Sequence, residues 1–115
     1  MIETTLIKYL NNNLNVEAFA EYPEKAPEQF VLLEKTGSET SYSITSATIA
    51  IQSYANSLLD AMKLNKEVKK AMERLWELDC MIRCELNTDY NFTDVSTRKY
   101  RYQAVFDITY YEEDV

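Results

Sequence analysis

The chain begins with a helical pattern and then changes to the two-residue period of strands. Apolar residues recur at the three- and four-residue spacing of one helix face at Ile2, Leu6, Tyr9 and Leu10. Three asparagines at residues 11–13 then favour leaving the helix. From Val16 apolar and polar side chains alternate, until Pro23 and Pro27 bracket a loop. We therefore expect a short first helix and then a strand with one polar face.

The next segment has the pattern of a β-hairpin. Residues 29–35 form a compact apolar run, and the only glycine, Gly37, lies in a Thr-Gly-Ser sequence that favours a turn. In the returning strand the inward-facing positions change parity between Ile44 and Ala47, and one extra residue explains such a change. We predict a turn at residues 36–38 and a β-bulge at residues 45–46.

Residues 56–78 return to the helical period. Their apolar stripe consists of Leu58, Leu59, Met62, Leu64, Val68, Ala71, Met72 and Leu75. Lysines, arginines and glutamates fill the opposite face, as in a solvated helix with ion pairs one turn apart. Because Asn65 is a favourable cap for a second helical segment, we predict a break near Leu64.

The last third of the chain contains two long alternating runs. One side of the first run consists of Cys80, Ile82, Cys84 and Leu86. One side of the second run consists of Tyr100, Tyr102, Ala104, Phe106 and Ile108. Polar residues typical of turns are concentrated in residues 87–97, which predicts an extended antiparallel hairpin with that stretch as its connection.

The predicted elements follow the order α-β-β-β-α-β-β. This order favours an α+β fold, in which two or three helices pack on a mostly antiparallel mixed sheet of about five strands with an extended C-terminal hairpin. The sequence has 115 residues and no linker-like segment, so we expect a single domain over residues 1–115.

Composition excludes several classes of function. The chain has no histidine, one glycine and a net charge of −7. Nucleophilic triads that use histidine as base are therefore excluded, as are the glycine-rich loops that bind phosphates or dinucleotides. The acidic balance argues against a nucleic-acid-binding surface, and the chain lacks a membrane-spanning run and a signal-peptide pattern. We expect a non-enzymatic protein with no catalytic residues and no membrane partner.

Few residues are candidates for metal or cofactor chemistry. Cys80 and Cys84 are the only cysteines, and on one strand their Cα atoms lie about 13 Å apart, too far for a disulfide. They also supply only half of the ligands of a structural zinc site. Asp89 and Asp94 are a conceivable acid–base or Ca²⁺-binding pair, although acids in polar loops commonly serve turns. We expect two buried, reduced thiols and neither a metal nor another cofactor.

Aromatic residues are concentrated around the predicted final hairpin, in a chain with nine Tyr and four Phe. Only one side of an amphipathic strand faces the helices, so Val105 and Tyr111, opposite Phe106, are left for solvent or a partner. Tyrosine is favoured at interfaces because it combines apolar area with a polar tip. The alternative is that these aromatics fill an extended minor core. The candidate interface residues are Tyr90, Phe92 and Asp94 in the hairpin arm, and Val105 and Tyr111 on its outer face.

Three segments together resemble a known group of phage proteins. They are SATIAIQSYA at residues 46–55, LNTDYNFTD at residues 86–94 and KYRYQAVFD at residues 99–107. This combination resembles small proteins encoded in the tail-gene region of long-tailed phages and prophages of Gram-positive bacteria, over residues 30–110. Such proteins are similar to tail terminators. The resemblance implies a structural protein that forms a hexameric ring, stops growth of the tail tube and presents the surface that joins the head.

The resemblance also implies partners and a location. The partners are further copies of the chain, the phage tail tube protein and head–tail connector proteins, with self-association expected through the hairpin of residues 86–102. The location is the host bacterial cytoplasm during assembly and then the virion tail. DNA only passes through the ring, and the net charge of −7 predicts a neutral or acidic channel, with Glu112, Glu113 and Asp114 as candidates for its rim.

Three other functions stay open on the sequence alone. The first is another head–tail connector or a head-completion subunit of the same phage. The second is a regulatory protein-binding module, which should stay monomeric until its partner is added. The third is a small-molecule-binding or enzymatic α+β domain, which should contain a deep pocket with convergent polar groups.

Overall fold

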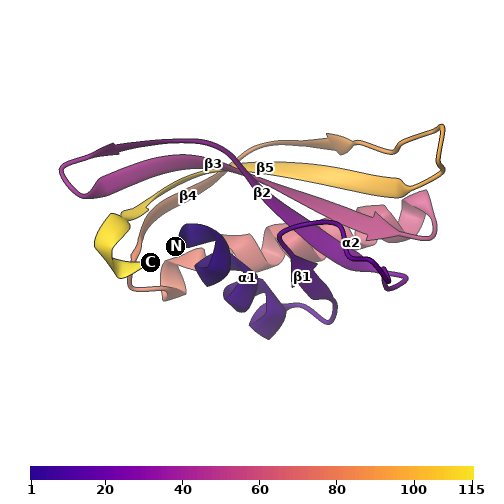
Figure 1. The fold of residues 1–115 in the computed structure, drawn as a ribbon, viewed down its shortest axis with the longest axis horizontal. Helices are drawn as coiled ribbons and strands as arrows, with labels where there is room; N and C mark the ends of the chain where they lie inside the picture. Colours follow the sequence, from indigo (N-terminus) through magenta and orange to yellow (C-terminus); the bar gives the residue numbers. More distant parts are fainter.

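The computed structural model describes residues 1–115 as one twisted sheet with both α-helices on the same face (Figure 1). The elements are α1 (Ile2–Asn13), β1 (Glu17–Phe19), β2 (Phe30–Ser41), β3 (Ile44–Ala55), α2 (Leu58–Glu73), the short 3-10 helix η1 (Leu75–Glu77), β4 (Met81–Asn91), β5 (Tyr100–Tyr111) and a second 3-10 helix, η2 (Glu112–Asp114). The strand order is β1-β2-β3-β5-β4, with β1 and β2 parallel and all other pairs antiparallel. The predicted fold class is confirmed: two α-helices pack on a five-stranded mixed sheet that includes a C-terminal hairpin.

The helices pack on the sheet through the apolar stripes that their sequences contain. All four apolar residues predicted for the face of α1 are buried. From α2, Leu64, Val68, Ala71 and Met72 belong to one core cluster with Ile49, Ile51, Phe106 and Ile108 of the sheet. The Oη of Tyr9 donates a hydrogen bond of 2.7 Å to the carbonyl oxygen of Ala71 and so joins the two helices. Neither helix combines the length and the apolar content needed to cross a lipid bilayer.

Helix α2 is continuous through Asn65, so the predicted break near Leu64 is wrong. Ser57 caps the helix instead, and its hydroxyl accepts a hydrogen bond of 3.1 Å from the backbone N–H of Asp60. The Asn65 side chain is only 3% exposed, and its Nδ2 donates a hydrogen bond of 2.8 Å to Oδ2 of Asp89 on β4. A partner distant in sequence therefore decides the conformation of Asn65 rather than a local preference for capping.

The apolar stripe predicted for α2 is correct only in its later part. Leu59 and Met62 are exposed, whereas Ala61 is fully buried. Ala61 lies three residues before Leu64 and seven before Val68, which places it on the buried face, and a helix on a sheet buries one face only. Leu75 continues the buried stripe into η1.

The β2–β3 hairpin turns at Tyr42 and Ser43, so the predicted turn at residues 36–38 is wrong. Both turn residues have positive φ angles, 52° and 64°, as a two-residue hairpin turn of this hand requires. Asn and Gly are the usual residues there, and neither is present. Gly37 instead lies within β2 without a positive φ, and no atom lies within 4 Å of the position that a Cβ there would take.

The bulge in this hairpin lies in β2, so the bulge predicted at residues 45–46 is also wrong. The register shifts between Lys35 and Gly37, which leaves Thr36 as the extra residue, whereas β3 pairs with β5 without interruption. Thr45 is 1% exposed and Ile44 is 40% exposed. The side of β3 that faces the helices therefore begins at Thr45 and stays the same along the strand. The predicted change of side came from assigning Ile44 to the core.

Strands β4 and β5 form the predicted hairpin, with longer strands and a shorter connection than expected. Its connection is residues 92–99 rather than 87–97, because β4 continues to Asn91. The register of β4 shifts between Met81 and Arg83 and between Leu86 and Thr88. These bulges interrupt the simple alternation on which the prediction for this strand was based.

The predicted burial of one side of residues 80–86 is only partly correct. Cys80 precedes β4 and is buried, and Cys84 is half-buried against the core. Ile82 is 44% exposed because it lies at a bulge, and Leu86 is 45% exposed because β4 is the edge strand. An alternating sequence shows which residues share a side, but not how far the helices cover an edge.

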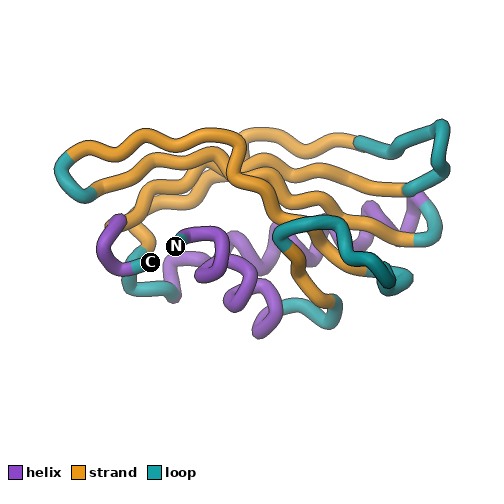
Figure 2. The backbone as a smooth tube through the Cα atoms, in the orientation of Figure 1, coloured by secondary structure: helices purple, strands orange, loops and turns teal.

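The molecule measures 44 × 25 × 23 Å, and the β2–β3 hairpin extends beyond the helices at one end of its long axis, whereas at the other end α2 reaches almost as far as the β4–β5 connection (Figure 2). Figure 2 shows the β2–β3 turn at one end of the long axis and the β4–β5 connection at the other, with the helices below the sheet. We call residues 90–101, at the second end, the arm. No helix covers the opposite face of the sheet, which we call the outer face.

Candidate protein–protein interface

The outer face carries the candidate residues from β4 and β5. In β5 the buried residues Ala104, Phe106, Ile108 and Tyr110 face the helices. Since successive side chains of a strand point to opposite faces, Val105 and Tyr111 lie on the outer face, as the sequence predicts. Tyr90 is opposite Gln103 in the register and also lies on this face.

The five candidate residues do not form one cluster. Val105 is half-buried near the middle of β5. Tyr111, at the end of β5, is 46% exposed and pairs with Ile44, which is 40% exposed. The arm begins at the other end of β5, about 30 Å away at the usual rise per residue. The arm contains the remaining three candidates, Tyr90, Phe92 and Asp94.

Arg101 fixes the base of the arm. Its Nε donates a hydrogen bond of 2.6 Å to the carbonyl oxygen of Phe92, and its Nη1 donates one of 2.7 Å to the Oη of Tyr54 on β3. The guanidinium also lies 4.4 Å from the centre of the Phe92 ring. Tyr90 and Phe92 pack edge to face at 5.9 Å. The planar, multiply donating side chain of arginine suits this combination of stacking and hydrogen bonding.

A chain of side-chain hydrogen bonds crosses the outer face from β3 to β4. The Oη of Tyr54 donates to Oε1 of Gln52 at 3.3 Å, and Nε2 of Gln52 donates to Oε1 of Gln103 at 2.9 Å. The Nε2 of Gln103 in turn donates to the Oη of Tyr90. Gln52 and Gln103 are each 8% exposed, although no helix covers them. Such a buried and connected network fixes the positions of its members, so Tyr90 is held in place from β3.

An aromatic cluster lies next to the arm. Phe30 and Tyr54 stack at 4.7 Å, and Tyr22 packs edge to face against both, at 5.4 and 5.5 Å. Phe19 adds an edge-to-face contact with Phe30. The Nζ of Lys99 lies 4.3 Å from the centre of the Tyr22 ring and links the arm to this cluster. Phe30 and Tyr54 are the buried members of this cluster, whereas Tyr22, Tyr90 and Phe92 stay 44%, 39% and 38% exposed.

Asp89 and Asp94, considered in the sequence as an acid–base or Ca²⁺-binding pair, bind different partners in the structure. The Asp94 carboxylate accepts hydrogen bonds from the backbone N–H and the hydroxyl of Ser96, at 3.1 and 2.7 Å. These bonds, with those from Thr97, lower the pKa of Asp94 to about 2. Asp89 instead accepts a hydrogen bond of 2.8 Å from Nζ of Lys69 on α2, which lowers the pKa of Asp89. No three residues of the metal-binding types His, Cys, Asp and Glu are arranged to hold a metal ion.

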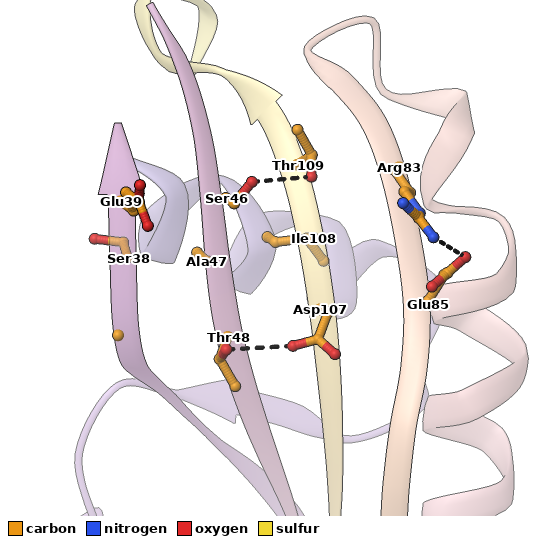
Figure 3. Close-up of a pocket in the computed structure, with 11 residues that line it drawn as sticks. Ser38, Glu39, Ser46, Ala47, Thr48, Arg83, Glu85, Asp107, Ile108 and Thr109 are labelled. Atoms are coloured by element: carbon orange, nitrogen blue, oxygen red, sulfur yellow. Dashed lines mark hydrogen bonds and ion pairs between the residues drawn. The ribbon is translucent and has the colours of Figure 1, made fainter. Parts of the chain in front are cut away.

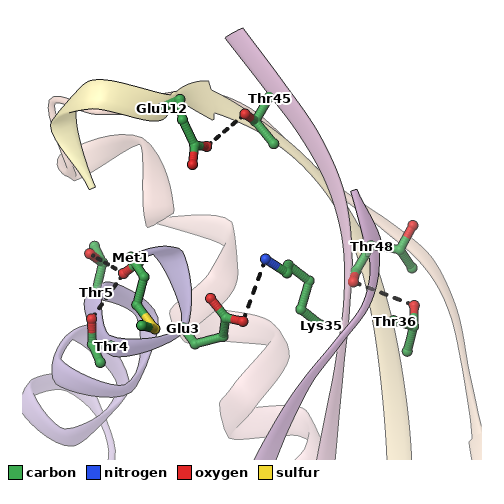
Figure 4. Close-up of polar contacts among 9 residues, drawn as sticks. All are labelled: Met1, Glu3, Thr4, Thr5, Lys35, Thr36, Thr45, Thr48 and Glu112. Atoms are coloured by element: carbon green, nitrogen blue, oxygen red, sulfur yellow. Dashed lines mark hydrogen bonds and ion pairs between the residues drawn. The ribbon is translucent and has the colours of Figure 1, made fainter. Parts of the chain in front are cut away.

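Hydroxyl groups and backbone bonds hold the opposite end of the sheet. The Oγ1 of Thr45 donates a hydrogen bond of 2.6 Å to Oε2 of Glu112 (Figure 4). The backbone N–H of Glu112 donates to the carbonyl oxygen of Ser43 at 2.9 Å, and that of Tyr111 donates to Cys80 at the same distance. Helix η2 is thereby joined to the β2–β3 turn and to the segment before β4.

A polar hollow of about 530 Å³ lies on the outer face towards this end (Figure 3). Thr48 donates a hydrogen bond of 3.3 Å to Asp107, and the hydroxyls of Ser46 and Thr109 lie 3.3 Å apart. Cross-strand pairs of this kind satisfy one another's polar groups. The hollow is therefore an open polar surface, unlike the aromatic surface beside the arm.

Both cysteines lie where burial disfavours the thiolate. Burial raises the pKa of the Cys84 thiol to about 11 and also raises the pKa of Cys80. Because the thiolate is the reactive form, neither side chain is an activated nucleophile at neutral pH.

No protein-family model matches this chain, and no curated protein matches it. Residues 46–55, 86–94 and 99–107, singled out in the sequence, lie in β3, in β4 with the start of the arm connection, and in β5 with the residue before it. These strands are neighbours in the sheet and supply most of the outer face. Sequence analysis selected Tyr90 and Phe92 on this surface but missed Arg101, Gln52 and Gln103. The parity of β5 could have identified Arg101 and Gln103, which alternate with Ala104 and Phe106.

Proposed function

We propose that this chain is a structural subunit of a long-tailed bacteriophage that assembles into a ring on the end of the tail tube. The ring ends polymerisation of the tube and offers the surface to which the head is joined. The proposal is supported by the sequence resemblance of residues 46–55, 86–94 and 99–107. The observation that carries it is the placement of two hairpin connections at opposite ends of one sheet whose outer face has no helix.

This shape favours head-to-tail assembly. A surface at one end of a subunit that fits a surface at the other end makes a heterologous contact, and such contacts close into a ring when the rotation between subunits allows it. The sheet also has free backbone edges. β4 has a neighbour only on the side of β5, and β1 covers only residues 30–32 of β2. Free strand edges are suited to binding a neighbouring chain through backbone hydrogen bonds.

The expected partners of this ring are the tail tube protein on one side and the head–tail connector proteins on the other. DNA passes through the ring without being held, since a net charge of −7 per subunit opposes phosphate binding. A gel-shift titration of the purified protein at low salt checks this point, and tight, salt-sensitive binding of duplex DNA contradicts it.

Deletion of the gene from the phage tests the proposed function. Without a terminator, tails are expected to grow past their normal length and to remain unattached to heads, and the wild-type gene supplied in trans should restore both. Tails of normal length that fail to join DNA-filled heads identify a head-completion or connector subunit instead. Tails of normal length on infectious particles contradict any role in tail ending or head joining.

A further inference from the structure

The connection of the arm forms a basic surface on an otherwise acidic molecule. Residues 92–101 contain Arg98, Lys99 and Arg101 and only one acidic residue, Asp94, in a chain with a net charge of −7. None of the three basic side chains forms an ion pair within the chain. Arg98 and Lys99 are exposed, as is Val95, at 85%. We call residues 94–99 the basic tip.

The opposite end of the long axis is acidic. Glu112, Glu113 and Asp114 form η2, and Asp79 lies near them because the N–H of Tyr111, just before η2, donates to the carbonyl oxygen of Cys80, just after Asp79. All four carboxylates are exposed, and none forms an ion pair. We call these residues, together with the adjoining β2–β3 turn, the acidic end.

The acidic end also exposes apolar side chains. Tyr42 at the β2–β3 turn is 98% exposed, and Ile44 and Tyr111 are 40% and 46% exposed. An arginine guanidinium stacks favourably on an aromatic ring. Tyr42 therefore provides a ring on which Arg98 can stack, at a place where carboxylates already attract a positive charge.

We propose that the basic tip of one copy docks on the acidic end of the next copy. This inference rests on the proposed ring function and names the contact that closes the ring. The two surfaces lie at opposite ends of a molecule 44 Å long (Figure 1). One copy cannot bring them together, and a two-fold dimer that uses either end alone places like charges against each other. A head-to-tail contact between copies matches opposite charges at every joint, and the other arrangement that does so, a reciprocal two-fold dimer, stops at two subunits.

The contact assigns η2 to the joint between subunits rather than to the channel rim expected from the sequence. It also explains how a chain with net charge −7 associates with itself. Attraction between the paired ends acts at short range, whereas repulsion between the bodies is screened beyond about 8–10 Å at physiological salt.

Charge reversal at each end tests the contact. Arg98→Glu/Lys99→Glu gives a subunit with two acidic ends, and Asp79→Lys/Glu113→Lys/Asp114→Lys gives a subunit with two basic ends, because three lysines then outnumber the remaining carboxylate of Glu112. Each variant alone should associate at least about tenfold more weakly than the wild type. Mixed in equal amounts, they should form rings in which the variants alternate, with an even number of subunits. The matched control is Lys63→Glu/Lys66→Glu on the exposed side of α2, which should leave assembly unchanged.

Native mass spectrometry gives the subunit number and composition, and circular dichroism checks that each variant is folded. Replacement of residues 95–98 by Asn-Gly is a second variant, which shortens the tip without changing the acidic end. Its tip should bind neither another copy of the same variant nor Arg98→Glu/Lys99→Glu. Folded single variants that assemble like the wild type, or a mixture that stays monomeric, overturn the contact. Loss of duplex DNA binding in Arg98→Glu/Lys99→Glu with assembly intact also overturns it, because the tip is then a phosphate contact.

The contact and the proposed function fail in distinguishable ways. Wild-type rings that tolerate both charge reversals remove the contact but leave the ring function. Charge-dependent assembly in a protein whose deletion leaves tails and heads normal removes the phage function but leaves the contact. A wild-type protein that stays monomeric at high concentration, with tail tubes present, removes both.

Discussion

The two ends of the sheet are both hairpin ends, yet different interactions hold them. At the arm, Arg101 and a chain of buried amide and phenol groups join three strands across the outer face. At the acidic end, Thr40 and Thr45 lie with their hydroxyls 2.6 Å apart, and Thr45 binds Glu112. The arm is fixed by aromatic stacking with many donors, and the acidic end by a two-residue turn and short hydroxyl bonds. In the proposed head-to-tail contact, the arm of one copy would therefore meet the β2–β3 turn and η2 of the next.

Of the substitutions that test this difference between the two ends, Arg101→Ala is expected to have the largest effect on the free energy of unfolding. The substitution leaves the carbonyl oxygen of Phe92 and the Oη of Tyr54 without their charged donor and removes the stacking on Phe92. We expect a loss of about 2–3 kcal/mol in the free energy of unfolding, measured by urea denaturation. Faster amide exchange should be confined to the arm. Arg83→Ala, which removes an exposed ion pair with Glu85, is the control and should cost less than about 1 kcal/mol. Equal effects of the two substitutions contradict the bracing role of Arg101.

At the acidic end the corresponding substitution is Thr45→Val. It preserves the shape of a side chain that is 1% exposed but removes its hydrogen bonds to Thr40 and Glu112. A loss of about 1–2 kcal/mol is expected, with η2 released from the β2–β3 turn. Amide exchange at Glu112, whose N–H binds Ser43, reports that release. If exchange there is unchanged, the threonine bonds do not hold the acidic end.

A smaller effect of opposite sign is expected from Tyr42→Asn. Tyr42 has a φ of 52°, a conformation that asparagine adopts more readily than tyrosine. The monomer should gain about 0.5–1 kcal/mol in stability while its self-association weakens, because the exposed ring of the receptor is lost. Paired thermal denaturation and light scattering measure the two effects. A variant that is both less stable and equally associated contradicts the assigned role of Tyr42.

The smallest effect at neutral pH concerns the thiols between the two ends. Because burial raises the pKa of Cys84 to about 11, native labelling by a thiol reagent should be slow and should accelerate as pH rises above 9. The unfolded thiol ionises first, so the stability contributed by this group is complete below about pH 9 and is lost as pH rises towards 11. Cys84→Ser should flatten that pH dependence in urea titrations. Fast labelling of both cysteines at pH 7 shows that the segment around β4 opens readily.

Sequence periodicity was sufficient for features that depend on which side of an element is buried. The face of α1, the order of the elements and the outward direction of Val105 and Tyr111 all follow from spacing alone. Features set by pairing between distant segments were not accessible in this way. The turn at Tyr42 and Ser43 contains neither Asn nor Gly, and its place follows from the register between β2 and β3.

Sequence periodicity could not predict the contacts of the candidate interface for the same reason. Arg101 binds Tyr54, which is 47 residues away, so its role depends on the register between β3 and β5. Asn65 has the sequence character of a cap but serves Asp89, 24 residues later. The separation of the basic and acidic residues is likewise invisible in the net charge, because it appears only when the strands place them at opposite ends.

Native mass spectrometry of the equimolar mixture of Arg98→Glu/Lys99→Glu and Asp79→Lys/Glu113→Lys/Asp114→Lys tests the central claim most directly. The account predicts closed rings with equal numbers of the two variants, whereas each variant alone associates at least about tenfold more weakly than the wild type. Rings formed by either variant alone, or a mixture of folded proteins that contains only monomers, would contradict head-to-tail assembly through the two ends of the sheet.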